Sequence, residues 1–377
     1  EGLVRMSHAA GNRSDYIQGG GGNTSAKLPD GLMAIKASGF CLKDMEVDKA
    51  YAVLNGAAIR EFYKNTDPEG IRDVEKTGSA ITKENTLKVE GLAELRPSVE
   101  AGFHSILKNY VLHTHSVYAN LAACSKSCKE IAQIAFAGAP YSWGWVDYTD
   151  PGSQLTFAIR DELSRVVWDT GKMPSVIMMQ NHGIIVHDDD VNTAIAIHTD
   201  ANNRIAALFG MSGNAFPEIR IKELAGGMYL ADVPYLKECL KEGTYTWQFL
   251  MEEPLYPDQM VFLTDTFFMD EEKVEEGKCV ASTKTGELIL NMDEKKAMTM
   301  VETLTAVFFI MNNITAAGYE LSTMGEAAKD FISNWESEKY RKSLAGNKER
   351  LQRREAWCGQ TADPAECEEY EQQRFKT

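Results

Sequence analysis

Residues 96–123 read RPSVEAGFHSILKNYVLHTHSVYANLAA, and this stretch decides the fold. The apolar residues of 99–109 recur at helical spacing. Residues 110–115 have the length and the apolar start of a short strand, and the alanine-rich residues 116–123 predict a second helix. This alternation of helix and strand predicts an α/β protein.

The flanking sequence adds further strands. Residues 24–28 and 32–36 enclose a Pro-Asp-Gly turn, which predicts a hairpin. Residues 176–180 have the apolar run of a buried strand, and residues 183–187 are its expected partner. The acidic triplet that follows predicts a helix N-cap and a helix that ends near Phe209.

The second half of the chain has a mixed pattern. Residues 261–264 and 287–290 are predicted strands, and residues 293–317 a long helix. From Asn334 onward, runs of Glu, Lys and Arg are typical of a solvated helix or tail. We expect a first domain of residues 1–216, a mixed α/β extension of residues 217–345 and a charged tail of residues 346–377.

Composition excludes two classes of partner. The chain has 377 residues, with 39 Lys and Arg against 55 Asp and Glu, so its formal net charge is −16. Nucleic-acid binding needs a basic face, and basic residues cluster only in the tail. An acidic surface also repels anionic membranes. The charge favours a small-molecule enzyme with no nucleic acid or membrane as a partner.

The expected location is the cytoplasm. No apolar run approaches the ~18 residues that a membrane span needs. The chain begins at Glu1 without a charged and then apolar leader, so no signal peptide is expected. The seven cysteines are scattered, and the Cys124–Cys128 pair has no second pair with which to hold zinc. We expect reduced thiols.

The strongest chemical signal is His113-Thr114-His115. Alternate residues of a strand point to one face, so both imidazoles can reach one metal ion, although a histidine pair can also line a polar cleft. The candidates for a third ligand are His104, His182, His187 and His198. His198 shares the apolar stripe of its helix and points inward, where it can be a core histidine with a hydrogen-bond partner or can complete an open tripod with the pair. Three nitrogen ligands favour Zn²⁺, with Mn or Co as alternatives.

Two further residues have competing interpretations. His182 lies in a turn between two strands, where a supporting role is expected. Glu100 begins a helix and can project toward the histidine strand, where a shielded carboxylate can act as general acid or base. A Glu in the first turn is also favoured by the helix dipole, and on the residues alone this second interpretation is preferred.

Small residues predict an anion site. The glycine run of residues 19–22 leads into Asn23, and its backbone can wrap an anion. Two more small-residue turns are Ser38-Gly39 and Pro97-Ser98. Three such contacts beside a metal tripod describe a phosphorylated substrate that a metal chelates at its other end.

Taken together, these segments resemble the class II aldolase/adducin family, which includes fuculose- and rhamnulose-phosphate aldolases. The matching segments occur in the family's order across roughly residues 1–215: GGGNTSAK (20–27), KASG (36–39), RPSVEAGFH (96–104), HTH (113–115), QNHG (180–183) and the helix with His198. The longer members, in which a rhamnulose-phosphate-aldolase-like region is fused to a dehydrogenase, are the most similar. Residues 217–377 lack a dehydrogenase signature.

The resemblance implies an αβα fold around a mostly antiparallel sheet, and a homotetramer with active sites between subunits. It implies Zn²⁺ on His113, His115 and His198, and Glu100 as the acid/base residue. The implied phosphate contacts are Gly22, Asn23, Ser38, Gly39 and Ser98. Val99 stands where short aldolases often carry a second serine, and Tyr340 and Tyr370 are the candidates for the family's tail proton donor.

The implied reaction is cleavage of a ketose 1-phosphate to dihydroxyacetone phosphate and a short aldehyde through a metal-stabilised enediolate. The family's 4-epimerases carry Asp at the position of Glu100, which favours the aldolase. An epimerase or a sugar-acid phosphate decarboxylase on the same metal site remains an alternative. A non-catalytic adducin-like scaffold is a further one, disfavoured because the three histidines and Glu100 are present.

Overall fold

The structure, a computed structural model, describes residues 1–212 and 214–334, and its residues 1–332 form one compact unit. The expected boundary near Phe216 and Pro217 lies inside this unit. The predicted charged tail and the candidates Tyr340 and Tyr370 lie outside the described residues.

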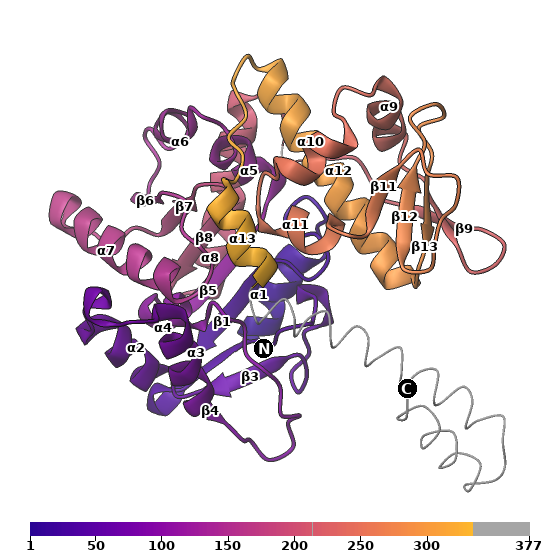
Figure 1. Cartoon of the computed structure of the whole chain (residues 1–377). Coiled ribbons are helices and arrows are strands. Elements are labelled where there is room, and N and C mark those ends of the chain that lie inside the picture. The colour runs from indigo at the N-terminus through magenta and orange to yellow at the C-terminus, as the bar shows by residue number, and fades with distance from the viewer. Residues whose placement is uncertain (213, 335–377) are drawn as a thin grey trace, which may run out of the picture. The chain divides into compact units, whose positions relative to one another are not determined.

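An eight-stranded sheet forms the centre of the N-terminal part, in the order β4-β3-β2-β1-β5-β8-β7-β6 (Figure 1). Among these strands, β6 and β7 pair in parallel and the other neighbours pair antiparallel. The expected mostly antiparallel sheet is therefore confirmed. Its strands are β1 (Asn23–Lys27), β2 (Met33–Lys36), β3 (Tyr51–Leu54), β4 (Thr86–Leu87), β5 (Tyr110–Thr114), β6 (Trp143–Val146), β7 (Val176–Met179) and β8 (Gly183–Asp188).

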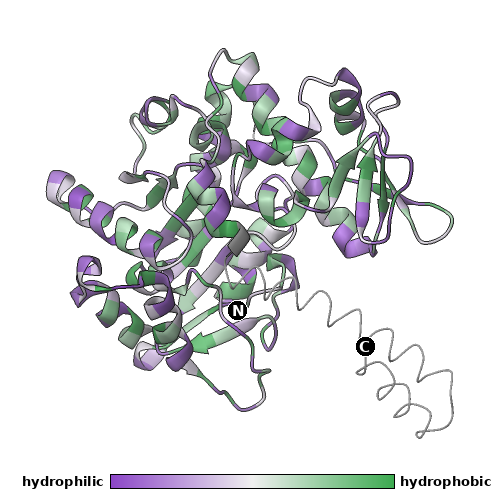
Figure 2. Ribbon diagram, viewed as in Figure 1, coloured by the Kyte–Doolittle hydropathy of each residue, from purple (hydrophilic) through white to green (hydrophobic). Residues whose placement is uncertain are grey.

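Helices cover both faces of this sheet, as the alternation of side chains along β5 requires. Val111 packs into the core under α2, α4 and α7, whereas Leu112 packs into the core under α1, α5 and α8. The expected αβα layering is confirmed. The helices of the N-terminal part are α1 (Gly2–Gly11), α2 (Gly56–Asn65), α3 (Val74–Glu84), α4 (Ala101–Ile106), α5 (Val117–Ala123), α6 (Cys128–Ala135), α7 (Ser153–Thr170) and α8 (Val191–Leu208). In Figure 2, α7 alternates hydrophilic and hydrophobic residues, as a helix with one buried side does.

A second sheet follows in the order β11-β12-β13-β10-β9. Its strands are β9 (Ile221–Glu223), β10 (Tyr229–Ala231), β11 (Phe267–Met269), β12 (Lys278–Ala281) and β13 (Leu288–Asn291). The helices of this part are α9 (Pro234–Glu242), α10 (Trp247–Glu252), α11 (Pro257–Leu263), α12 (Glu294–Ala316) and α13 (Glu326–Asn334). The predicted mixed α/β character of the extension is thus confirmed.

The long helix α12 joins the two sheets to one core. It packs against α5, and its apolar side chains belong to the same buried cluster as those of α1, α5 and α8. Its length and its mean hydropathy of 1.3 would suit a membrane span, but 78% of that window is buried. Such burial is typical of the core helix of a folded domain.

Two predicted elements differ from the structure. Residues 261–264, predicted as a strand, fall largely within α11, because Pro257 at the first helical position starts a helix that runs to Leu263. A four-residue apolar run does not distinguish strand from helix by itself. The helix expected over 99–109 is shorter and spans Ala101–Ile106.

Buried His187 of β8 makes the folded state sensitive to acid. Burial lowers the pKa of its imidazole to about 3, so the folded protein keeps it neutral where the unfolded chain takes up a proton near the ordinary value of 6.5. Its contribution to stability is therefore present above about pH 6.5 and is lost as the pH falls toward 3.

We expect His187→Leu to lose less stability on acidification than the wild type, because leucine takes up no proton. The difference should be roughly 2 kcal/mol between about pH 7 and about pH 4.5. Urea unfolding of the full chain at both pH values measures it. The same loss in both proteins would contradict the assignment.

Candidate metal centre

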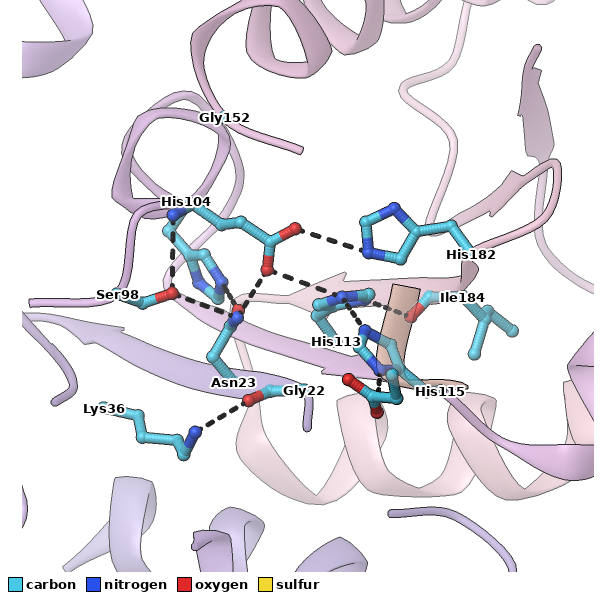
Figure 3. A network of polar contacts seen from close by, with 12 residues as sticks. Gly22, Asn23, Lys36, Ser98, His104, His113, His115, Gly152, His182 and Ile184 are labelled. Atoms are coloured by element: carbon cyan, nitrogen blue, oxygen red, sulfur yellow. Dashed lines mark hydrogen bonds and ion pairs between the residues drawn. The ribbon is translucent and has the colours of Figure 1, made fainter. Parts of the chain in front are cut away.

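The end of β5 brings two imidazoles together. His113 and His115 lie on the side of the strand that faces α4, since they share the direction of Val111. Their Nε2 atoms are 3.1 Å apart, and both side chains are buried (Figure 3). The sequence-based prediction that these two histidines form a pair is confirmed.

The outer nitrogen of each ring is already engaged. His113 Nδ1 lies 3.0 Å from the carbonyl oxygen of Ile184, and His115 Nδ1 lies 2.5 Å from Oδ2 of Asp258. Because a carbonyl or carboxylate oxygen accepts, Nδ1 donates in each case, and the Nε2 of a neutral ring keeps its lone pair. Two lone pairs that face each other across 3.1 Å repel, and a cation between them would turn this repulsion into attraction.

His182 supplies a third nitrogen. It lies in the turn between β7 and β8, after Asn181, whose φ of 49° is in the left-handed region. The ligand atoms of His113, His115 and His182 all lie within 4.8 Å of one another. Three buried imidazoles at this spacing are a donor set that a divalent cation such as Zn²⁺ accepts.

Glu100 completes the wall of this cluster. Its Oε1 lies 3.4 Å from Nε2 of His182 and its Oε2 lies 3.6 Å from Nε2 of His113. Glu100 is the N-cap residue of α4, as the helix-start interpretation expects, but its side chain makes no capping hydrogen bond and lies against the histidines instead. Oε1 has no hydrogen-bond partner among the described residues, which leaves it available to a bound ion or substrate.

His198 is not part of the cluster, and this corrects the expected ligand set. Its helix α8 covers the opposite face of the sheet, where Thr114 points. Its Nε2 lies 2.7 Å from Oγ1 of Thr114, and its ring packs edge-to-face on Tyr16. His198 is thus a core histidine with a hydrogen-bond partner, and His182 occupies the place that was expected for it.

Of the residues expected to bind phosphate, Asn23 and Ser98 contact each other beside Glu100, and Gly22 precedes Asn23 (Figure 3). The Nδ2 of Asn23 donates to Oε2 of Glu100 at 2.6 Å and to Oγ of Ser98 at 3.2 Å. The amide N–H of Ser38 donates to the carbonyl of Arg96 at 2.8 Å, and Gly39 follows with a φ of 87°. Hydrogen bonds therefore bring Asn23 and Ser98 to Glu100, and they bring Ser38 to the segment that precedes Ser98.

A buried lysine organises the glycine run. Lys36 Nζ donates to the carbonyl oxygens of Gly20 at 2.8 Å and Gly22 at 3.1 Å. Gly22 has a φ of 58°, and a Cβ there would lie 2.6 Å from the carbonyl oxygen of His113. The loop passes so close to β5 that a side chain at Gly22 does not fit.

Burial sets the charge state of the centre. It lowers the pKa of His113 to about 4, and it takes the pKa of His182 well below its ordinary value. Burial alone would raise the pKa of Glu100, but the neighbouring His113 and His182 and the Asn23 hydrogen bond bring it below its usual value. At neutral pH the centre therefore combines the neutral imidazoles of His113 and His182 with the ionised carboxylate of Glu100.

One residue of the centre, Asp258, carried no usable signal in the sequence. Asp258 is buried at the start of α11 and contacts His115. It comes shortly before residues 261–264, which were predicted as a strand. His104 was a candidate ligand, but both of its ring nitrogens make hydrogen bonds. Its Nδ1 lies 2.7 Å from Oγ of Ser25, and its Nε2 is hydrogen-bonded to Oδ1 of Asn23. His104 therefore orients Asn23. For His182, the signal available in the sequence was the QNHG segment (180–183).

We expect His182→Gln to weaken Zn²⁺ binding by more than the ~10–100-fold that loss of an outer partner costs, because it removes a nitrogen of the cluster. His198→Gln is the matched control and should bind one ion per chain as the wild type does. Elemental analysis and chelator competition measure both. Normal binding by His182→Gln together with loss in His198→Gln would restore the ligand set expected from the sequence.

Comparisons with known proteins concern the N-terminal part. Residues 1–205 match the family model described as Class II Aldolase and Adducin N-terminal domain. No curated protein matches the chain. Among solved structures, the N-terminal class II aldolase domain of a conserved protein from Thermoplasma acidophilum is 20% identical, with a TM-score of 0.44, over 54% of this chain and 90% of that one.

Two further solved structures are similar over the same part. YgbL from Klebsiella pneumoniae, a putative aldolase/epimerase/decarboxylase, is 17% identical with a TM-score of 0.37, over 56% of this chain and 88% of that one. The L-fuculose-1-phosphate aldolase of Thermus thermophilus is 12% identical with a TM-score of 0.33, over 55% of this chain and 92% of that one. The family model covers more than half of the chain, and the protein belongs to the class II aldolase and adducin N-terminal domain family.

Proposed function

We propose that this protein is a divalent-metal-dependent aldolase that cleaves a ketose 1-phosphate to dihydroxyacetone phosphate and a short aldehyde. The observation that carries the proposal is the convergence of His113, His115 and His182 beside the buried carboxylate of Glu100. A non-catalytic scaffold needs neither a buried cluster of ligand nitrogens nor an ionised carboxylate aimed at it.

Zn²⁺ is the proposed cofactor, because nitrogen ligands with an open position suit it, and Mn or Co could replace it. When bound, such a cation would act as a Lewis acid on the carbonyl oxygen of the ketose. His113, His115 and His182 would hold it, and Glu100 lies within reach of the same point.

Glu100 is the proposed acid/base residue. In the cleavage direction the C3–C4 bond breaks, its electron pair stays on C3, and the ionised Glu100 takes the proton of the C4 hydroxyl as the aldehyde forms. Glu100 returns a proton to C3, and in the condensation direction its ionised form removes that proton. Asn23 holds Oε2 of Glu100, and Oε1 has no hydrogen-bond partner among the described residues, so Oε1 is the proposed proton carrier.

The phosphate of the substrate is proposed to lie on the backbone and hydroxyl groups of Gly22, Asn23, Ser38, Gly39 and Ser98. Two of them, Asn23 and Ser98, lie beside Glu100, which suits a substrate with its phosphate at C1 and its carbonyl at C2. Lys36 adds a buried positive charge beneath the loop. A homotetramer is part of the same proposal and rests on the family membership alone.

We expect the Zn²⁺-loaded protein to release dihydroxyacetone phosphate and an aldehyde from at least one member of a panel of pentulose and hexulose 1-phosphates. Glu100→Gln should lower kcat by about 10²–10⁴-fold, because the proton transfer loses its base. Coupled enzyme assays and NMR of the products measure this. Removal of the metal by a chelator should abolish turnover, and its return should restore it.

The matched control is Glu162→Gln, which changes a largely buried carboxylate of α7 that binds Arg165 outside the centre. It should keep the wild-type kcat. Full turnover by Glu100→Gln and His115→Ala would contradict the proposal. Products that are epimers of the substrate, or release of CO₂ from a sugar-acid phosphate, would assign the same metal centre to a different reaction.

A further inference from the structure

A segment C-terminal to the family domain contacts the cluster of His113, His115 and His182. Asp258, in the first turn of α11, is 2% exposed, and its Oδ2 lies 2.5 Å from Nδ1 of His115. The residue match to the family ends at 205, so this contact comes from the C-terminal part of the chain. The ring of buried Tyr256 lies 6.3 Å from the ring of His115 and closes the same side.

The segment is also tied to the turn that carries His182. The Nδ2 of Asn181 donates to the carbonyl oxygens of Leu255 at 2.8 Å and Ser322 at 2.7 Å. Gln259 braces the segment from within, since its Oε1 accepts from the N–H of Leu255 at 2.8 Å. Two of the three histidines are therefore held, directly or through a neighbour, by residues outside the family domain.

The glycine run leaves room for this contact. A Cβ on Gly21 would lie 2.2 Å from Oδ2 of Asp258 and 3.1 Å from Nδ1 of His115. A real side chain cannot occupy that space. The Asp258 carboxylate can therefore contact His115 only because residue 21 is a glycine.

We propose that Asp258 is the positioning residue of His115, which holds the ring by its Nδ1–H so that Nε2 faces His113 and His182 as a metal ligand. The proposal rests on the metal site of the proposed function. A carboxylate behind a ligand histidine fixes its tautomer and its orientation and increases the basicity of the nitrogen that binds the metal. His113 is held instead by the backbone carbonyl of Ile184.

Metal affinity tests this role in the full chain. We expect Asp258→Ala and Asp258→Asn to bind Zn²⁺ and Co²⁺ about 10–100-fold more weakly than the wild type, measured by chelator competition. Asp258→Asn is the sharper variant, because its amide can donate to Nδ1 and so favours the tautomer whose Nε2–H faces the cluster. It should be at least as weak as Asp258→Ala.

The matched control is Glu302→Gln, at a second carboxylate from the C-terminal part. Glu302 is 9% exposed and its Oε2 accepts from the N–H of Gly19 at 2.8 Å, at the far end of the glycine run from His113. It should keep the wild-type metal affinity. Unchanged affinity in both Asp258 variants, or an equal loss in Glu302→Gln, would overturn the proposal.

A spectroscopic test on the wild type does not depend on how the variants fold. Long-range ¹H–¹⁵N correlations of the metal-free protein should show the His115 ring with its proton on Nδ1. A proton on Nε2 alone would overturn the proposal. Weaker binding by the Asp258 variants supports it even if no ketose 1-phosphate is cleaved, because that second result bears on the proposed reaction only.

Discussion

The pairing of β5 between β1 and β8 is the constraint on which the centre depends. The register sets Asn23 opposite His113 on one edge of β5 and Ile185 opposite His113 on the other. The first pairing places the glycine run and Asn23 next to the histidines, and the second places the turn with His182 there. Antiparallel pairing of the three strands thereby brings three segments that are distant in the sequence together at the cluster.

The alternation of side chains along β5 explains what could be predicted of the site. That His113 and His115 share a face follows from the period of any strand. Which inward-pointing histidine joins them depends on which helix covers that face, and this is a property of the tertiary arrangement. His198 and His182 are both buried, and the strand separates them.

The other limits also have physical causes. The hairpin of β1 and β2 was predictable because its turn residues are specific, whereas the apolar run of α11 suits two structures. The acid/base role proposed for Glu100 follows only from the family's motif, since a helix-start Glu has a common structural explanation. Asp258 is 143 residues from His115 in the chain, and no local pattern reports a contact of that range.

The core that α12 shares with α1, α5 and α8 bears on how such a protein can be recombined. Here, residues 1–216 severed from the rest would expose the apolar faces of those helices and leave His115 without its carboxylate. A chimera that contains only residues 1–216 would need its new partner to cover these apolar faces and to supply a carboxylate to His115.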